Sequence, residues 1–177
     1  MNSDLHQELS RLIALRGRVD EALEWGLIEH ASLRDVALRV LPMLCEEVGA
    51  KAAFLRTYGE NLELTTFVWP EGTSIPEEAR VFEMVGESNH KDADLTAAGS
   101  RIIACPLDVV GTWFGAAGAI FESNAPPDAR YTMSALHTAC EVLDNYLFAV
   151  KAAREKHRVM MALGTALRHR VLSEGVR

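Results

Sequence analysis

The polar stretch Asn89–Asp94 carries the densest group of side chains that could hold an ion or a small ligand. His90, Asp92 and Asp94 are metal-ligating types, but the stretch lacks the Asp/Asn-Gly pattern of a calcium loop and no second set of ligands lies nearby. A solvated polar loop therefore explains these residues better than a metal site. His90 and Arg101 could instead face an anion, because a guanidinium group binds carboxylate or phosphate through two hydrogen bonds.

Bulky aromatic residues form a second group of candidates. Ligand pockets are mostly apolar with a few polar groups, so some of these side chains could line a pocket, although each also suits a plain core. Arg56 shares a predicted strand face with Phe54, and a buried guanidinium needs an anion or a carboxylate as its partner. Arg56 is therefore the strongest single polar candidate. The predicted ligand-binding residues are Phe54, Arg56, Phe67, Trp69, Phe82, His90, Arg101 and Trp113.

No catalytic residue is predicted. The spacing suggests neither a Ser-His-Asp nor a Cys-His arrangement, and Gly111 and Gly115 do not form a phosphate-binding loop. Cys45, Cys105 and Cys140 lie far apart along the chain without a CxxC pair, which argues against a disulfide framework and a zinc site. We therefore expect no enzymatic activity and no metal, and the sequence does not identify a cofactor.

The composition is that of an ordinary globular chain, with 49% hydrophobic and 24% charged residues among 177. No apolar run approaches the roughly 18 residues of a membrane span, and the N-terminus is no signal peptide, so we expect a cytoplasmic protein. Residues 1–150 carry a net charge of −12 and residues 151–177 a net charge of +5. An acidic body suits nucleic acid poorly, and the basic tail lacks interleaved aromatic residues, so neither nucleic acid nor a membrane is an expected partner.

These residues need a scaffold, and the apolar pattern predicts two helices at the start of the chain. Leucines and valines at steps of three and four predict a helix over residues 4–25 and a second one that begins near Ser32. Ser32 and Asp35 make a capping box at the start of the second helix, and Gly49 is expected to end it.

Residues 52–69 alternate with a period of two around a short turn, which predicts an antiparallel hairpin, and a turn around Gly111 between two further strands predicts a second one. Ser74 and Glu77 resemble another capping box, which predicts a short helix as far as Val85, and the polar residues 87–99 are predicted to be a loop. Residues 115–119 are small, which we attribute to close packing. The predicted strands of the two hairpins are residues 52–58 with 62–69, and residues 101–107 with 113–122.

The chain from Pro127 onward predicts a helix of about 40 residues with an apolar seam at alternating steps of three and four. At about 1.5 Å per residue this helix is roughly 60 Å long, so its second half needs a partner, which a second copy of the chain best supplies. Whether the two copies run parallel stays open, as does whether His157 sets the register or acts as a pH switch. The predicted dimer contacts are Leu5, Leu9, Leu12, Leu143, Tyr146, Val150, Ala153, His157, Met160 and Leu167.

The segment Ile102–Phe121, IIACPLDVVGTWFGAAGAIF, resembles the C-terminal hairpin of a GAF domain, and the order of predicted elements over residues 27–150 is similar too. The resemblance implies an α+β fold with a GAF/PAS-like central antiparallel sheet, terminal helices on one face, a short lid on the other and a long C-terminal signalling helix. It implies three parts, which are a dimerisation helix at 1–26, a GAF-like domain at 27–150 and a coiled-coil signalling helix at 151–177.

Two departures from the family narrow the expected function. The Asn-Lys-Phe-Asp-Glu signature of cyclic-nucleotide-binding members is not recognisable after Asn89 and Lys91, and no cysteine lies in the predicted lid, where bilin-binding and methionine-sulfoxide-reducing members need one. The resemblance then implies a non-catalytic sensory module that binds an unknown small molecule. Such a module signals through dimeric helices to an output domain of the cyclase, kinase or phosphodiesterase type, absent from this chain. The alternatives are a ligand-free structural dimerisation module and, disfavoured, a GAF-type methionine sulfoxide reductase.

Overall fold

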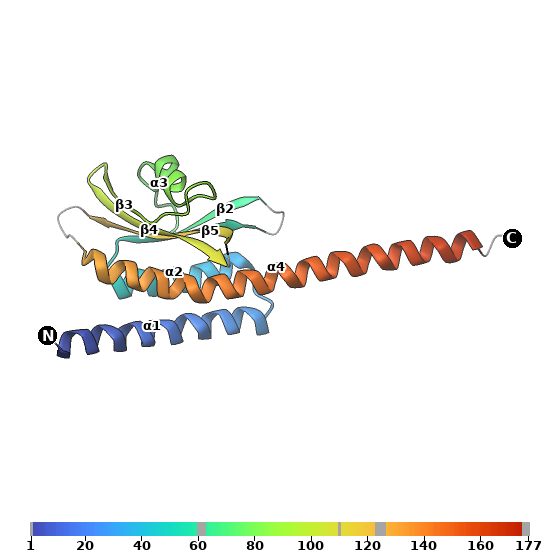
Figure 1. Ribbon diagram of the computed structural model, residues 1–177, viewed down its shortest axis with the longest axis horizontal. Coiled ribbons are helices and arrows are strands. Elements are labelled where there is room, and N and C mark those ends of the chain that lie inside the picture. The colour runs from blue at the N-terminus through green and yellow to red at the C-terminus, as the bar shows by residue number, and fades with distance from the viewer. Residues whose placement is uncertain (1, 60–62, 110, 123–126, 175–177) are drawn as a thin grey trace. The chain divides into compact units, whose positions relative to one another are not determined.

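The computed structural model describes residues 2–59, 63–109, 111–122 and 127–174 (Figure 1). The chain divides into two units, Met1–Asp144 and Asn145–Arg177. The first unit holds the sheet with its helices and the start of α4 (Ala129–Glu174), and the second holds the remainder of that helix. Among the described helices, none is both long and apolar enough to cross a membrane.

The sheet of the first unit has five strands in the order β2-β1-β5-β4-β3, and every neighbouring pair is antiparallel. The central strands are buried along most of their length because helices cover both faces, which explains their nearly unbroken apolar sequence. The strands are β1 (Ala52–Tyr58), β2 (Leu64–Trp69), β3 (Ala93–Ala97), β4 (Ser100–Val109) and β5 (Thr112–Glu122). The predicted α+β class with a central antiparallel sheet is therefore confirmed.

Helices cover the two faces of this sheet unequally. Figure 1 shows α2 (Leu33–Val48) and the start of α4 on one side, with α1 (Asn2–Ile28) packed beyond them, and the short α3 (Glu78–Val85) on the other side. The predicted caps of α2 are confirmed, since the backbone N–H of Asp35 donates to Ser32 Oγ at 3.1 Å and Gly49 adopts a left-handed φ of 67°.

Beneath α3, apolar side chains form a cluster that we call the lid-side cluster. The ring of Phe54 fills its centre and crosses the ring of Phe82 edge-on, with 5.6 Å between centroids. Gly118 of β5 makes room for Phe54, because a Cβ added there would lie 2.3 Å from Phe54 Cζ. Close packing therefore explains this small residue, as the sequence predicted. The cluster consists of Ala52, Phe54, Ile75, Val81, Val85, Ala93, Leu95, Ala97, Ile102, Ala104, Ala116 and Ile120.

Two local predictions between the hairpins were wrong. Residues 93–97, predicted to be part of a loop, form the edge strand β3, in which buried Ala93, Leu95 and Ala97 alternate with two exposed residues. Two of the three buried side chains are alanines, so the alternation is weak in the sequence although the pleat is regular. The capping box at Ser74 is also absent. The residue preceding α3 is Glu77, which has a φ of 45° and makes no side-chain cap, and pairs instead with Arg80 at 3.0 Å.

The helix α4 is longer than predicted, at 46 residues. Within the second unit its side chains are exposed or half-buried from Val150 to Arg168. The large apolar residues exposed along this stretch are Val159, Met160, Met161, Leu163 and Leu167.

Candidate functional site

A polar hollow of about 500 Å³ lies where the chain leaves α3 and where β4 turns into β5. Two short segments build it, residues 87–90 after α3 and residues 111–113 at the start of β5. Its walls combine carboxylate, hydroxyl, amide and imidazole groups with one indole ring, so the hollow suits a small polar molecule better than an apolar one. The lining residues are Glu87, Ser88, Asn89, His90, Gly111, Thr112 and Trp113.

Hydrogen bonds with the end of α3 hold both walls of this pocket. The backbone N–H groups of Asn89 and His90 donate to the carbonyl of Gly86 at 3.0 and 2.9 Å, and the Asn89 amide donates to the carbonyl of Glu83 at 2.8 Å. On the other wall, Trp113 Nε1–H donates to the carbonyl of Val85 at 2.9 Å. These bonds tie the pocket to α3 from two sides.

His90 combines a left-handed backbone with a defined polar partner. Its φ is 47°, in a region that histidine adopts more often than most other residues. Its Nδ1 lies 2.8 Å from Asp108 Oδ2, so this nitrogen carries the hydrogen that it donates and leaves Nε2 as the second polar group of the ring. His90 thus brings a hydrogen-bonded imidazole to the wall of the pocket, which makes it the centre of the candidate site.

Asp108 links the pocket to α4. A register shift between Leu107 and Asp108 interrupts the pairing of β4 with β5, and bulges of this kind re-aim the side chains beside them. One carboxylate oxygen of Asp108 faces His90, and its backbone N–H donates to the carboxylate of Asp144 on α4. The same residue therefore touches the pocket on one side and the helix on the other.

Asp144 is an unusual residue for a helix face that packs on a sheet, because its carboxyl group is buried with a relative exposure of 8%. Burial is the main cause that raises the pKa of this carboxyl to about 7; the nearby charge of Asp108 acts in the same direction, and the hydrogen bond from the Asp108 backbone acts against both. Within the described part of the chain, neither Asp108 Oδ1 nor Asp144 Oδ1 has a hydrogen-bond partner. Asp144 therefore exchanges a proton near neutral pH.

The eight residues predicted to bind a ligand divide among three places. His90 and Trp113 line the pocket. Phe54, Arg56 and Phe82 meet beneath α3, where the Arg56 guanidinium stacks 4.2 Å from the Phe82 ring centroid and pairs with Glu78 at 3.5 Å. Glu78 thus supplies the carboxylate partner that Arg56 was predicted to need.

Phe67, Trp69 and Arg101 alternate with residues of the lid-side cluster and therefore face the other side of the sheet. Phe67 borders a smaller hollow with Arg34 and Leu38 of α2. Arg101 holds Asp94 through two hydrogen bonds of 2.9 and 2.8 Å, and these bonds lower the pKa of Asp94. The structure thus separates these three residues from the pocket.

The three candidate metal ligands of the polar stretch point to three different partners. His90 binds Asp108, Asp92 lies 3.0 Å from His137 Nε2, and Asp94 binds Arg101. Across the residues that the structure describes, no three His, Cys, Asp or Glu side chains are placed to share a metal ion.

Comparison with known proteins gives a fold. No protein-family model and no curated protein matches the chain. Among solved structures, the GAF domain of an Acinetobacter phosphoenolpyruvate-protein phosphotransferase matches 82% of this chain and 95% of its own, with 11% identity and a TM-score of 0.59. The chain has a GAF fold.

Two further GAF domains support this assignment of the fold. That of the Escherichia coli potassium sensor histidine kinase KdpD covers 80% of this chain and 96% of its own, with 15% identity and a TM-score of 0.56. That of a Coxiella burnetii phosphoenolpyruvate-protein phosphotransferase covers 84% and 98%, with 13% identity and a TM-score of 0.58. The segment Ile102–Phe121, which resembles a GAF hairpin, forms the paired strands β4 and β5.

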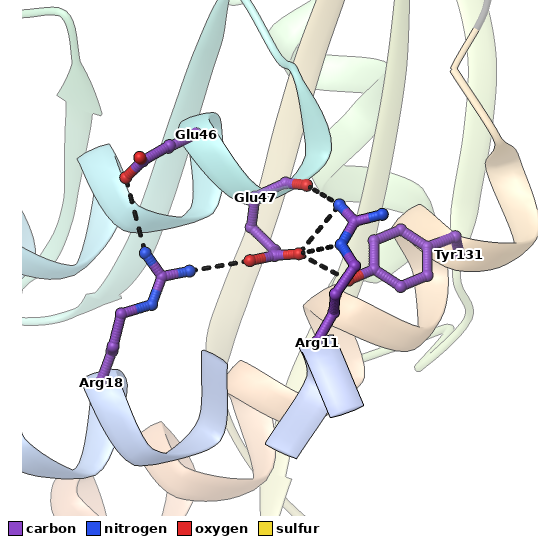
Figure 2. Close-up of polar contacts among 5 residues, drawn as sticks. All are labelled: Arg11, Arg18, Glu46, Glu47 and Tyr131. Carbon is purple, nitrogen blue, oxygen red and sulfur yellow. Dashed lines mark hydrogen bonds and ion pairs between the residues drawn. The ribbon is translucent and has the colours of Figure 1, made fainter. Parts of the chain in front are cut away.

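On the other side of this GAF fold, Glu47 of α2 joins three helices (Figure 2). Arg11 Nε of α1 and the hydroxyl of Tyr131 of α4 donate to Glu47 Oε1 at 3.0 and 2.6 Å, and Arg18 donates to Oε2 at 2.7 Å. Burial, followed by the hydrogen bond to Glu47, raises the pKa of Tyr131 to about 12. This network fixes α1 and the start of α4 on α2.

Sequence reasoning missed Asp108 and Asp144. Asp108 follows the apolar run 102–107 in β4, and its role depends on a bulge that leaves no mark in the sequence. Asp144 did leave a signal, since it lies four residues after the buried Cys140 on the face of α4 that packs in the core. An acidic residue at such a position needs either a partner or a function.

Proposed function

We propose that this chain is a non-catalytic regulatory domain that binds a small polar molecule in the pocket around His90 and passes the change to α4. The observation that carries the proposal is the position of Asp108, which accepts a hydrogen bond from His90 in the pocket and donates one to Asp144 of α4. A ligand that engages His90 alters the hydrogen bonding of Asp108 and, through the Asp108 backbone, that of Asp144.

The response depends on the raised pKa of Asp144. Near neutral pH, a carboxyl with a pKa of about 7 changes between its neutral and charged forms at little cost in free energy. A charged Asp144 is costly in its buried position and favours another arrangement of the helix around it. The ligand shifts the balance only in so far as it binds the two arrangements unequally. From Asp144 the helix continues to Glu174, which gives the change a route to an output domain.

We propose further that two copies pair through α1 and α4. Leu5 and Leu9 of α1 are 58% and 54% exposed, and Met160 and Leu167 of α4 are 63% and 62% exposed. Two members of the predicted interface, Leu143 and Tyr146, are buried in the single chain, so the exposed residues are the ones available to a partner. The structural neighbours include GAF domains of a sensor histidine kinase and of phosphoenolpyruvate-protein phosphotransferases, which supports a regulatory role.

A second candidate is a structural dimerisation module that binds no ligand. It is favoured by the lid-side cluster, since the space between α3 and the sheet, where the family resemblance places a ligand, is filled by Phe54 and its neighbours. The pocket around His90 lies at the end of α3 and shares no lining residue with this cluster.

Ligand-observed and protein-observed NMR distinguish the two candidates. The probes are a panel of small carboxylates, amino acids and purine bases at millimolar concentration. Our proposal predicts that at least one probe shifts the amide signals of residues 87–90 and 111–113, and that His90→Gly removes the effect while His30→Gly retains it. His30 is a matched control because it also has a positive φ, of 51°, and lies outside the pocket. If no probe shifts these signals, the structural module is the better account.

A further inference from the structure

The cysteines offer an independent observation. Cys105 of β4 and Cys140 of α4 are 35 positions apart in sequence, yet their Sγ atoms lie 3.1 Å from each other. Both residues are buried, with relative exposures of 0% and 3%, and both belong to the first unit. Their separation along the chain argued against a disulfide framework, but α4 brings them together across the face of the sheet.

We propose that Cys105 and Cys140 form a site of reversible oxidation, in which a disulfide bond fastens α4 to β4. A disulfide needs its sulfur atoms about 2.05 Å apart, so closure from the thiol pair requires a shift of roughly 1 Å. The third cysteine provides a contrast, since Cys45 Sγ–H donates to the carbonyl oxygen of Trp69 at 3.9 Å.

The oxidant that we assign to this site is hydrogen peroxide, because both sulfurs are buried and a small neutral molecule enters most readily when α4 opens. One thiol loses its proton and its sulfur attacks a peroxide oxygen; the O–O bond breaks, a sulfenic acid forms, and the released hydroxide takes up the proton to give water. The other sulfur then attacks the sulfenic sulfur, the S–S bond forms, the S–O bond breaks, and a second water leaves. Two thiols and one peroxide thus give one disulfide and two waters, and a low-molecular-weight thiol reverses the reaction.

The surroundings of Cys105 and Cys140 slow their oxidation but do not prevent it. The neighbouring Cys105 thiol and burial raise the pKa of Cys140 well above its ordinary value, and Asp144 and Asp92 add to the effect. Thiolate is therefore scarce while the two thiols remain packed, and oxidation proceeds through transient opening of α4. Sulfenic acid formed at either cysteine has its resolving thiol in direct contact, which Cys45 lacks within the described structure.

The bond closes a loop that contains the β4–β5 turn and Asp108, so it fastens α4 to the strand that bears the pocket contact. The formation of the bond does not depend on ligand binding. Its consequence for signalling rests on the proposed function, since an oxidised chain has lost the freedom of α4 to change its packing.

The sequence allows a direct test, because trypsin separates the three cysteines into peptides 40–51, 102–130 and 131–151. The folded chain is treated with hydrogen peroxide, free thiols are alkylated, and the digest is analysed by mass spectrometry. We expect an intact mass lower by about 2 Da and a linked pair of peptides 102–130 and 131–151, both reversed by reductant. Recovery of these two peptides unlinked, or linkage of either one to peptide 40–51, overturns the proposal.

A stability measurement tests whether the Cys105–Cys140 disulfide forms in the folded chain rather than only in unfolded molecules. Closing a loop of this length should raise the Tm of the oxidised chain by roughly 5–10 °C relative to the reduced chain. Cys45→Ser should keep this rise and Cys140→Ala should lose it, with circular dichroism checking that each variant is folded. A lower Tm after oxidation would show that the native pair does not suit the bond, and would also overturn the proposal. None of these outcomes depends on whether the pocket binds a ligand.

Discussion

Replacing Asp144 with asparagine should stabilise the chain at neutral pH, although it alters a buried side chain with a hydrogen bond. The folded chain holds the Asp144 proton up to a pKa of about 7, whereas the unperturbed value is 3.8. Between these values the folded state binds more protons than the unfolded state, so stability falls as pH rises from about 4 to about 7. An asparagine keeps an oxygen for the Asp108 N–H and carries no charge.

The size of the effect follows from the shift. Each pKa unit corresponds to about 1.4 kcal/mol, so the full shift would amount to about 4 kcal/mol. Screening by water reduces this figure, and we expect a gain of about 2 kcal/mol for Asp144→Asn at pH 8. At pH 5 the native carboxyl is already protonated, so the gain there should be small.

Urea unfolding of both chains at pH 5 and pH 8 measures this difference, with Asp20→Asn, on the exposed surface of α1, as the control. The variant should flatten the pH dependence of stability, and the control should leave it unchanged. A variant that loses stability equally at both pH values would refute the reasoning, because Asp144 would then act only as a hydrogen-bonding and packing residue.

Three further predictions concern the core and the helices. Glu47→Gln should lower the free energy of unfolding in urea by about 1–3 kcal/mol. The Glu46 side chain is 79% exposed, so Glu46→Gln should change this free energy by less than about 0.5 kcal/mol. Equal effects of the two substitutions would contradict the network in Figure 2. Gly118→Ala should cost about 1–3 kcal/mol because its Cβ meets Phe54, while Gly164→Ala, with open space around it, should gain up to about 1 kcal/mol. Thermal unfolding of both chains that showed the same sign would count against the packing argument. For the proposed dimer, Leu9→Glu should weaken self-association by about tenfold or more, whereas Gln7→Glu should leave it unchanged. Sedimentation at micromolar concentration measures both, and a parent chain that sediments only as a monomer would contradict the proposed dimer.

Local chemistry made much of the fold predictable. The N-cap of α2 depends on two side chains three residues apart, and its C-cap depends on the single glycine at position 49. The strands β4 and β5 are apolar runs that flank a turn at Gly111, which reveals their pairing. The strand β3 was missed because its buried positions are mostly alanine. Ser74 failed as a cap because α3 begins four residues later, at Glu78, after a residue with positive φ.

The candidate site was less predictable because it depends on contacts between distant segments. His90 and Trp113 were identified as chemistry-bearing residues, but their common pocket forms only where the chain after α3 meets the start of β5. Asp108 acts through a bulge, and Cys105 meets Cys140 only when α4 lies in one register on the sheet. Spacing along the chain carries no information on either.

A double-mutant cycle between His90→Gly and Asp144→Asn, followed by urea unfolding at pH 7, tests most directly whether the pocket and α4 are linked through Asp108. The account predicts a coupling free energy of about 0.5–2 kcal/mol between the two changes, with His30→Gly and Asp144→Asn additive as the control pair. Additivity of His90→Gly with Asp144→Asn to within about 0.3 kcal/mol would contradict the link and, with it, the proposed route from the pocket to the helix.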